Sequence, residues 1–474
     1  MDNQHKSIHA FKDDALGTHD AVALAQLIAA KKISVQEIAQ ASVERALAVN
    51  PTLNAIECEY FEQLLQSPTF QSNQFFSGVP IFIKDNLDLA GYPTQQGSTS
   101  FISDIKKKNS KITQQILNGG FLAMGKSKMP EFGFNAATEF KDGHCTRNPW
   151  NLDYSCGASS GGSAALVASG VVPIAHANDG GGSIRIPAAN CGLVGLKPTR
   201  RRLMANEASE FLPVDLISDG VVTRSVRDTA YFFSEMEKQF QSKKLPPIGL
   251  VTQPIEKKLK IAVVYDSLQT SADVETKAVV QHTARLLEQA GHHIEEISLP
   301  VPDNFVDDFS QYWGFLAFSV HRFGKLMFGK SFDATELDHL SMGLSQLYQK
   351  NMLKTPLFIY RLKQIQRIYS QVFKQYDVVL SPVLTHATPE VGYLSPTQPF
   401  DELFEKLRQY VAFTPIQNIA GAPAISLPMG FTQQHRRPLG VMISADYGQE
   451  KILLELAYQL EQIQPFVKLS DENR

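Results

Sequence analysis

The region that most constrains the fold of this chain is residues 155–198, where two glycine-rich serine loops flank two short segments of small or apolar residues. The loops are residues 157–163 (GASSGGS) and residues 179–183 (DGGGS). Residues 161–169 are mainly glycine, serine and alanine and predict a closely packed helix, and residues 171–177 predict a buried strand. Strands and helices that alternate at this spacing favour an α/β fold, with helices on the faces of a sheet.

Other segments predict elements of the same class. Ser34 and Glu37 form a capping box that begins a helix, which we expect to stop before Pro51. Residues 236–260 are rich in lysine, glutamine and proline and predict a loop or linker.

The 474 residues suffice for two or three domains, or for one large α/β domain with a helical elaboration. Further predicted strands are residues 79–83, 259–266, 376–384, 422–430 and 439–445, and further helices are residues 275–291, most of 303–375, and 451–463.

The composition excludes several classes of function. A net charge of −3 gives no electrostatic basis for binding nucleic acid or an anionic membrane. The four cysteines include no C-x-x-C pair, so we expect no zinc site, no disulfide framework and no metal. The N-terminal residues include no apolar leader region, and no stretch reaches about 18 apolar residues. We therefore expect a cytoplasmic protein without a membrane or nucleic-acid partner.

The second serine loop has the features of a nucleophile with its own oxyanion hole. Three consecutive glycines before Ser183 allow the backbone to aim successive N–H groups into one concavity. Such donors stabilise an oxyanion, and the loss of one typically costs ~3–4 kcal/mol of transition-state stabilisation. These features predict a serine-dependent acyl-transfer enzyme.

A serine nucleophile needs a base, and the residues alone leave two candidates open. His176 lies upstream on the predicted strand, where a core or flanking histidine is the usual case. Lys84 ends an apolar strand, where partial desolvation would favour the neutral amine. The alternative for Lys84 is a surface ion pair with Asp85.

Two shorter motifs match those of other hydrolase classes, and each match lacks a feature that its class requires. Residues 157–161 match G-x-S-x-G, the nucleophile elbow of α/β-hydrolases. That elbow needs a preceding buried strand, whereas residues 148–156 contain proline, asparagine and aspartate. Residues 103–106 match the S-x-x-K of β-lactamases, but no K-T-G follows, so a lysine-rich loop is the better interpretation.

Six motifs together resemble the amidase signature family. They are long, they occur in a fixed order, and the resemblance covers roughly residues 15–465, with its weakest part at residues 236–370. The motifs are GVPIFIKDN (78–86), GKSKMPE (125–131), GASSGGS (157–163), DGGGSIRIP (179–187), GLKP (195–198) and the C-terminal pair ISLPMG and LGVMI.

This resemblance implies an amidase with a Ser–cisSer–Lys triad and no cofactor. By motif, the nucleophile is Ser183, the proton relay is Ser159, held by a cis peptide bond after Ala158, and the general base is Lys84. Their separations, 159 − 84 = 75 and 183 − 159 = 24 residues, are those of the family. Water would hydrolyse the acyl-enzyme. The implied oxyanion donors are the N–H groups of Gly180, Gly181, Gly182 and Ser183, and the implied supporting residues are Ser160, Asp179 and Arg185.

The resemblance also implies the architecture. It predicts one large α/β/α domain over residues 1–474, with a central mixed β-sheet covered by helices. Within it, residues 15–235 would form the catalytic core, residues 236–375 a variable helix-rich region that faces the substrate, and residues 376–465 the completion of the sheet. The expected partner is a small-molecule amide, and a homodimer is left open.

The chain departs from the usual family pattern at two positions, which helps to show which branch of the family it resembles. Ala158 stands where the family often has glycine, and Gly180 where it often has threonine. Gly180 and the residues after it are more similar to the branch that contains 6-aminohexanoate cyclic dimer hydrolases. The alternative function is the A subunit of a glutamyl-tRNA(Gln) amidotransferase, a partner-dependent glutaminase. That subunit resembles DTGGSIRQP where this chain has DGGGSIRIP. A non-catalytic scaffold is disfavoured because the three triad residues are intact.

Overall fold

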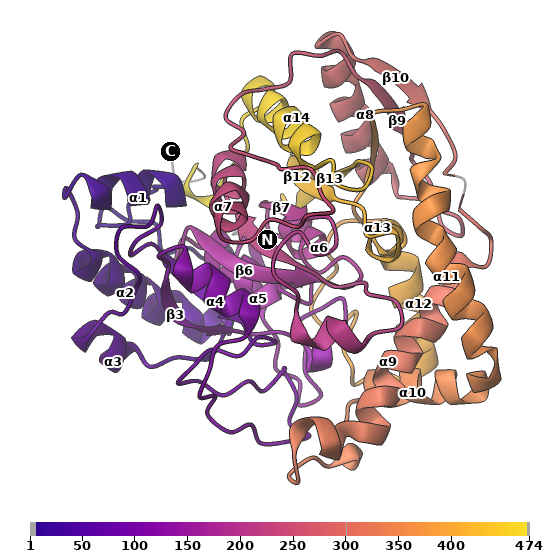
Figure 1. Cartoon of the computed structure of the whole chain (residues 1–474), viewed down its shortest axis with the longest axis horizontal. Coiled ribbons are helices and arrows are strands. Elements are labelled where there is room, and N and C mark those ends of the chain that lie inside the picture. The colour runs from indigo at the N-terminus through magenta and orange to yellow at the C-terminus, as the bar shows by residue number, and fades with distance from the viewer. Residues whose placement is uncertain (1–5, 300, 472–474) are drawn as a thin grey trace.

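The computed structural model describes residues 6–299 and 301–471, and in them eleven strands form one mixed sheet through the centre of the molecule (Figure 1). The strands are β1 (Ile56–Cys58), β2 (Pro80–Lys84), β3 (Leu122–Ser127), β6 (Ile174–Asp179), β7 (Val194–Lys197), β8 (Ser218–Thr223), β9 (Lys260–Val263), β10 (His293–Glu296), β11 (Val378–Pro382), β12 (Ala424–Phe431) and β13 (Pro438–Ser444). Their order in the sheet is β1-β3-β2-β6-β8-β7-β12-β13-β11-β9-β10. The strand β2 is parallel to β3 and β6, whereas β8 is antiparallel to β6 and β7. This mixed sheet confirms the predicted fold class.

Alternating apolar side chains let the sheet bury helices on both faces. On β2, Ile81 and Ile83 belong to one buried cluster and Phe82 to the other. The first cluster contains residues of α1 (Ala21–Ala29), α4 (Lys111–Asn118), α7 (Val226–Gln239), α8 (Val274–Gln289) and α14 (Glu450–Ile463). The second contains residues of α2 (Val35–Leu53), α3 (Phe61–Gln66), α5 (Gly161–Ala168) and α6 (Arg185–Asn190).

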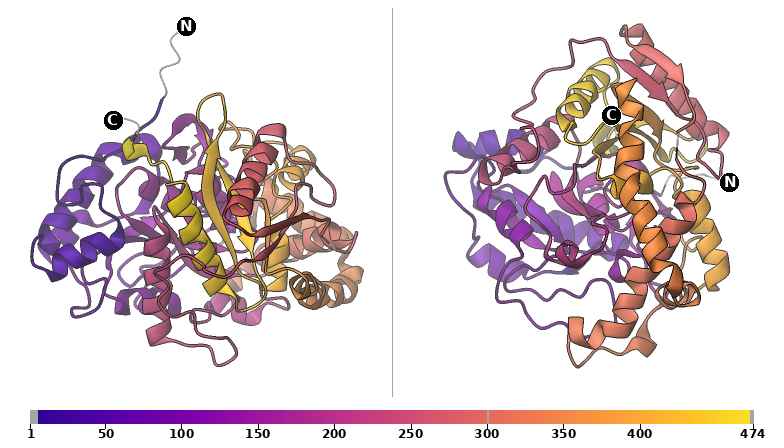
Figure 2. Two further views of the ribbon diagram at one scale, coloured as in Figure 1. Left: turned by 90° about the horizontal axis from the view of Figure 1, so that it is seen from above. Right: turned by 45° about the vertical axis from the view of Figure 1, so that its right-hand side comes forward.

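The predicted helical region at residues 303–375 is confirmed. It forms α9 (Phe305–Phe328), α10 (His339–Lys350) and α11 (Thr355–Ser370), and α9 packs against both of the others. These three helices lie on the side of the molecule opposite α1, α2 and α3 (Figures 1 and 2). Two further helices, α12 (Phe400–Tyr410) and α13 (Pro415–Ala420), lie between β11 and β12 in sequence and contact α10 and α11 respectively.

Three sequence predictions need correction at their boundaries. The capping box at Ser34 is present, but α2 does not stop before Pro51. The proline lies in the last turn, where it removes a single backbone bond, and the helix ends at Leu53, after which the C-cap residue Asn54 adopts the left-handed conformation with a φ of 52°. The expected loop at residues 236–260 begins only after α7, and the strand expected at residues 171–177 is β6, which begins and ends later.

A fourth correction concerns the segment before the first serine loop. Residues Asn151–Ser155 do form a strand, β5, although their composition predicted none. It pairs with β4 (Arg147–Asn148) in a small separate sheet, and its Tyr154 also forms an isolated bridge with Glu390. The first serine loop therefore does not follow a strand of the central sheet, and the α/β-hydrolase elbow remains excluded.

Candidate active site

The sheet brings Lys84 to both serine loops. Lys84 is the last residue of β2 and Asp179 is the last residue of β6, and these two strands are neighbouring and parallel. The carboxyl ends of parallel strands share one edge of a sheet, where the sites of α/β proteins are usually built. Ser159 and Ser160 directly precede α5, which packs on the same two strands.

The side chain of Lys84 is fully buried and makes three polar contacts. Its Nζ lies 2.6 Å from Ser159 Oγ, 3.0 Å from Ser160 Oγ and 2.5 Å from Asn178 Oδ1. The peptide bond between Ala158 and Ser159 is cis, as the resemblance implied. The surface ion pair considered for Lys84 is wrong, because Asp85 is buried and pairs with Lys126 at 2.9 Å.

These contacts direct the lone pair of a neutral Lys84 toward Ser159. Burial lowers the pKa of Lys84 to about 7, although the negative charges of Asp219 and Asp179 act to raise it. A neutral amine has two N–H groups and one lone pair. Asn178 Oδ1 can only accept, and Ser160 Oγ donates its own proton to the carbonyl of Asn178 at 3.2 Å. The two N–H groups therefore go to Asn178 and Ser160, and the lone pair faces the Ser159 hydroxyl.

The loop that carries Ser183 is held by the carboxylate of Asp179. Oδ1 accepts the N–H of Gly182 at 2.7 Å, and Oδ2 accepts the N–H of Ile184 at 3.2 Å. Arg185 donates to both oxygens, at 2.9 Å each. Burial alone would raise the pKa of Asp179, but the Arg185 guanidinium lowers it to about 2, so the carboxylate is charged. Asp179 and Arg185 thus hold the loop through hydrogen bonds, and their supporting role in catalysis stays a prediction.

The four predicted oxyanion donors are not equivalent. The N–H of Gly182 is committed to Asp179, whereas those of Gly180, Gly181 and Ser183 have no hydrogen-bond acceptor in the described part of the chain. Gly182 has a φ of 140°, and a Cβ there would lie 2.5 Å from Thr414 Oγ1. The position therefore accepts only glycine, and three of the four N–H groups remain available to an oxyanion.

Ser183 opens into a cavity of about 910 Å³ that Ser159, Asn178, Gly180 and Gly181 also line. Within the described ranges no hydrogen bond joins Ser183 to Ser159, although both residues line the same cavity. Catalytic hydrogen bonds commonly become short only when substrate is bound.

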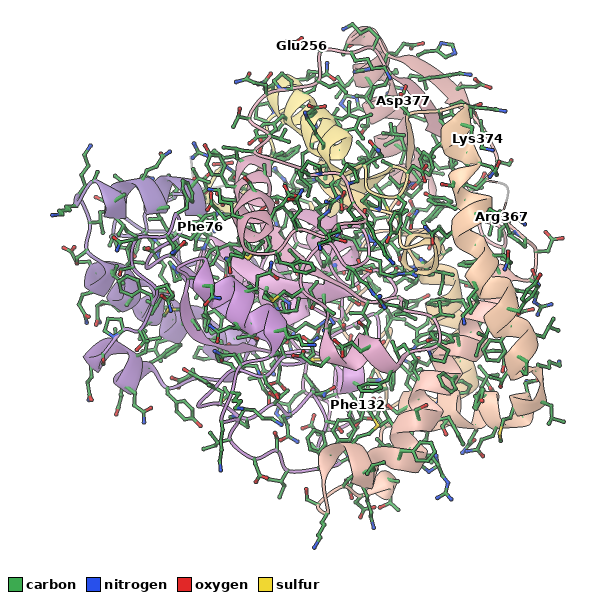
Figure 3. All side chains as sticks on the ribbon, viewed as in Figure 1. Phe76, Phe132, Glu256, Arg367, Lys374 and Asp377 are labelled. Carbon is green, nitrogen blue, oxygen red and sulfur yellow. The ribbon has the colours of Figure 1, made fainter. Side chains whose placement is uncertain are left out.

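The walls of this cavity are mainly apolar and come from distant segments. Phe309 and Trp313 of α9 line the cavity, and Phe132 and Phe134 of the segment after β3 line it as well. Phe132 lies at the border between the core and the lower end of α9 (Figure 3), with its ring 5.2 Å from that of Phe328. The region predicted to face the substrate thus supplies one wall of the cavity.

Only two charged side chains occur among the described residues that line the cavity, and both are paired. Arg408 donates to Asp307 at 3.2 Å, and Asp266 lies 2.8 Å from Lys277. The same described ranges contain no group of three histidine, cysteine, aspartate or glutamate residues placed to hold a metal ion. The cavity therefore offers Ser183, amide groups and aromatic surface, and little fixed charge.

Several residues of the site escaped the sequence analysis. His176 is a buried histidine, as expected, but its carboxylate partner Asp219, 3.2 Å away, is far along the chain and no local pattern signals it. Asn418 donates to Asp179 Oδ1 at 2.8 Å and is equally remote. Asn178 could have been found, because it is the polar residue next to Asp179 at the end of the predicted strand.

Comparison with known proteins agrees with this geometry. The amidase family matches residues 37–454. The chain belongs to the amidase family. It is 47% identical over 469 residues to AmiC of Mycobacterium tuberculosis, a protein named as an amidase, with 98% of this chain and 99% of AmiC covered. Membership makes this protein an enzyme of the class that hydrolyses amide carbon–nitrogen bonds.

Two further relatives represent the cyclic dimer hydrolase branch and the amidotransferase alternative that the sequence analysis considered. The 6-aminohexanoate-cyclic-dimer hydrolase of Paenarthrobacter ureafaciens is 30% identical over 488 residues, covering 94% of this chain and 95% of that protein. A solved structure of such a hydrolase superposes with a TM-score of 0.84 at 28% identity, over 96% of this chain and 98% of that one. The A subunit of the glutamyl-tRNA(Gln) amidotransferase of Alkaliphilus metalliredigens is 29% identical over 480 residues, covering 91% of this chain and 94% of that protein.

Across the described ranges of this amidase, no helix has the length and apolar character needed to cross a membrane.

Proposed function

We propose that this amidase hydrolyses a small, neutral, apolar amide through an acyl-enzyme on Ser183. The observation that carries the proposal is the 2.6 Å contact between Lys84 Nζ and Ser159 Oγ, beside the cavity into which Ser183 opens. A buried amine whose pKa is near 7 is a suitable general base at neutral pH.

In the proposed reaction, Ser183 Oγ attacks the amide carbonyl carbon. Its proton passes to Ser159, while the proton of Ser159 passes to Lys84. The N–H groups of Gly180, Gly181 and Ser183 bind the oxyanion that forms. The carbon–nitrogen bond then breaks, the amine leaves with the proton returned from Lys84, and the acyl group stays on Ser183. Water, deprotonated by the same route, attacks the ester and releases the carboxylic acid.

The charges of the cavity favour a neutral substrate over glutamine. Glutamine carries an ammonium and a carboxylate, and a buried charge is costly unless an opposite charge meets it. The charged lining residues, Arg408 and Asp266, are already paired with Asp307 and Lys277. Aromatic side chains such as Phe309 and Trp313 instead supply apolar surface. This arrangement disfavours the amidotransferase alternative.

The proposal also includes the division of the chain into three regions and the cellular compartment that the sequence predicted. We keep residues 15–235 as the catalytic core, residues 236–375 as the substrate-facing region and residues 376–465 as the completion of the sheet, and the placement of α9 and β11 to β13 supports that division. The four cysteines are free, which supports a reducing compartment such as the cytoplasm.

A substrate panel tests the proposed class. The purified chain, without partner proteins, is expected to hydrolyse neutral aryl, aliphatic or cyclic amides with kcat/KM at least about 100-fold above that for glutamine, because desolvating two unpaired charges costs several kcal/mol. Ammonia or amine release, measured with each compound, gives the comparison. Preferential hydrolysis of glutamine, or activity only with added subunits, would contradict this class.

The dependence of activity on pH tests Lys84 as the base. Only the neutral amine accepts a proton, and burial lowers the pKa of Lys84 to about 7. We therefore expect kcat/KM to rise about tenfold per pH unit below pH 7 and to level off above it. The check is a profile from about pH 5.5 to about pH 9 with a slowly reacting amide, so that chemistry limits the rate. A profile that stays flat from about pH 6 to about pH 9 counts against Lys84.

A further inference from the structure

The backbone N–H of Lys84 makes a hydrogen bond that the proposed reaction does not use. Strand pairing between β2 and β6 joins Ile81 to Ile174 and Phe82 to Ala175. Two residues farther along β2, past this pairing, the backbone N–H of Lys84 donates to a side chain instead, to Nδ1 of His176 at 3.3 Å.

This contact fixes the protonation of the imidazole. Nδ1 accepts a hydrogen bond, so a neutral His176 must carry its proton on Nε2. Nε2 lies 3.2 Å from Asp219 Oδ1, and the other carboxylate oxygen accepts from Asn206 Nδ2 at 3.2 Å. His176 is 0% exposed and Asp219 is 5% exposed, and burial lowers the pKa of His176, which keeps the ring neutral. A neutral imidazole therefore links the backbone of Lys84 to a buried carboxylate.

Asp219 differs from the other carboxylates around Lys84. Asp179 is compensated by the two hydrogen bonds of Arg185, and Asp85 is compensated by Lys126. The hydrogen-bond donors to Asp219 in the described residues are two neutral side chains, His176 and Asn206. The titratable groups that face Lys84 from β2, β3, β6 and β8 are Asp85, Lys126, His176, Asp179 and Asp219. Asp219 is thus the carboxylate in this set without a paired cation, and its negative charge favours the protonated amine.

We propose that Asp219, acting through His176, is a positioning residue that both holds the backbone of Lys84 and keeps its amine basic enough to accept the proton of Ser159. The inference rests on the proposed role of Lys84 as the base. Full burial without a nearby anion would leave the lysine neutral but weakly basic, and a weak base transfers protons poorly. Asp219 counteracts that loss without contacting the amine, so no ion pair blocks the lone pair.

The variant Asp219→Asn tests this proposal, because it removes the charge and retains the shape. The readout is the rate at which a serine-directed phosphonate inactivates the full chain, measured from about pH 5.5 to about pH 9, since this reaction needs the base but no known substrate. The midpoint of the rise is expected to move to lower pH by on the order of half a unit or more, with a lower plateau rate. Asp215→Asn is the matched control, since Asp215 is a buried carboxylate of the same segment that pairs with Arg201 at 3.1 Å. The midpoint in this control is expected to stay in place.

The outcomes separate the two proposals. If the wild-type protein shows no rise with pH, the proposed base fails. If the wild type shows the rise and folded Asp219→Asn keeps the same midpoint, or moves it upward, the role of Asp219 is overturned while Lys84 stands. A uniform loss of rate at an unchanged midpoint likewise overturns it, because a purely structural role gives that result. Should Asp219→Asn not fold, Asp219→Ser removes the same charge with a smaller polar group and is judged by the same midpoint.

Discussion

Replacement of Ser183 by alanine is expected to lower kcat/KM by at least about 10⁴-fold, because the proposed acyl-enzyme cannot form without the Ser183 hydroxyl. Oxyanion binding alone leaves only a small residual rate. In the described residues the Ser183 hydroxyl makes no hydrogen bond, so its removal should leave the folded structure unchanged. Steady-state hydrolysis of the best amide from the panel, together with thermal unfolding, checks both parts.

The control for this variant is Ser103→Ala, which makes the same change in the S-x-x-K motif. Ser103 lies in a loop outside the cavity and bonds only locally and to the loop at Thr94 and Gln95. Its activity should stay within about twofold of wild type. Folded Ser183→Ala protein that retained a tenth of the wild-type kcat/KM would exclude Ser183 as the nucleophile.

Replacement of Lys84 by methionine has the second-largest expected effect. Methionine has a similar length and no proton acceptor of comparable basicity, so kcat is expected to fall by about 10² to 10⁴ at every pH. The rise of activity through pH 7 should disappear with it, because that rise reports the deprotonation of Lys84. The measurement is the full pH profile of kcat and kcat/KM for the variant.

A change at a surface lysine provides the comparison for Lys84→Met. Lys111 is 49% exposed and pairs with Glu210 at the surface, so Lys111→Met should keep both the rate and the pH profile. A Lys84→Met enzyme that kept the same alkaline rise would show that another group titrates in the reaction. The neutral His176 beside the backbone of Lys84 would then be the next candidate.

The local parts of the site could be predicted from the sequence because short motifs encode them. The glycines before Ser183 and the apolar strand that ends at Lys84 are each defined by a few consecutive residues, so the sequence alone reveals them. The α/β class followed for the same reason, from segments whose apolar residues repeat with the period of a helix or strand.

The parts that could not be predicted depend on contacts between distant segments. Asp219 reaches His176 across 43 residues through the pairing of β6 with β8, and nothing near either residue signals the other. Gly182 was expected to serve the oxyanion hole like its neighbours, but the side chain of Asp179 takes its N–H. Which faces of α9 line the cavity likewise depends on how the helix packs, which no motif records.

The most direct test of the account is to identify the residue that forms the covalent intermediate. The wild-type chain is treated with a serine-directed phosphonate, and the modified peptide is located by mass spectrometry, with Ser183→Ala and Ser159→Ala treated in parallel. We expect one label per chain on Ser183, no label on Ser183→Ala, and slow labelling of Ser183 in Ser159→Ala, because the relay to Lys84 is lost. Stoichiometric labelling of Ser183→Ala, or a label on Ser159 in the wild type, would contradict the central claim.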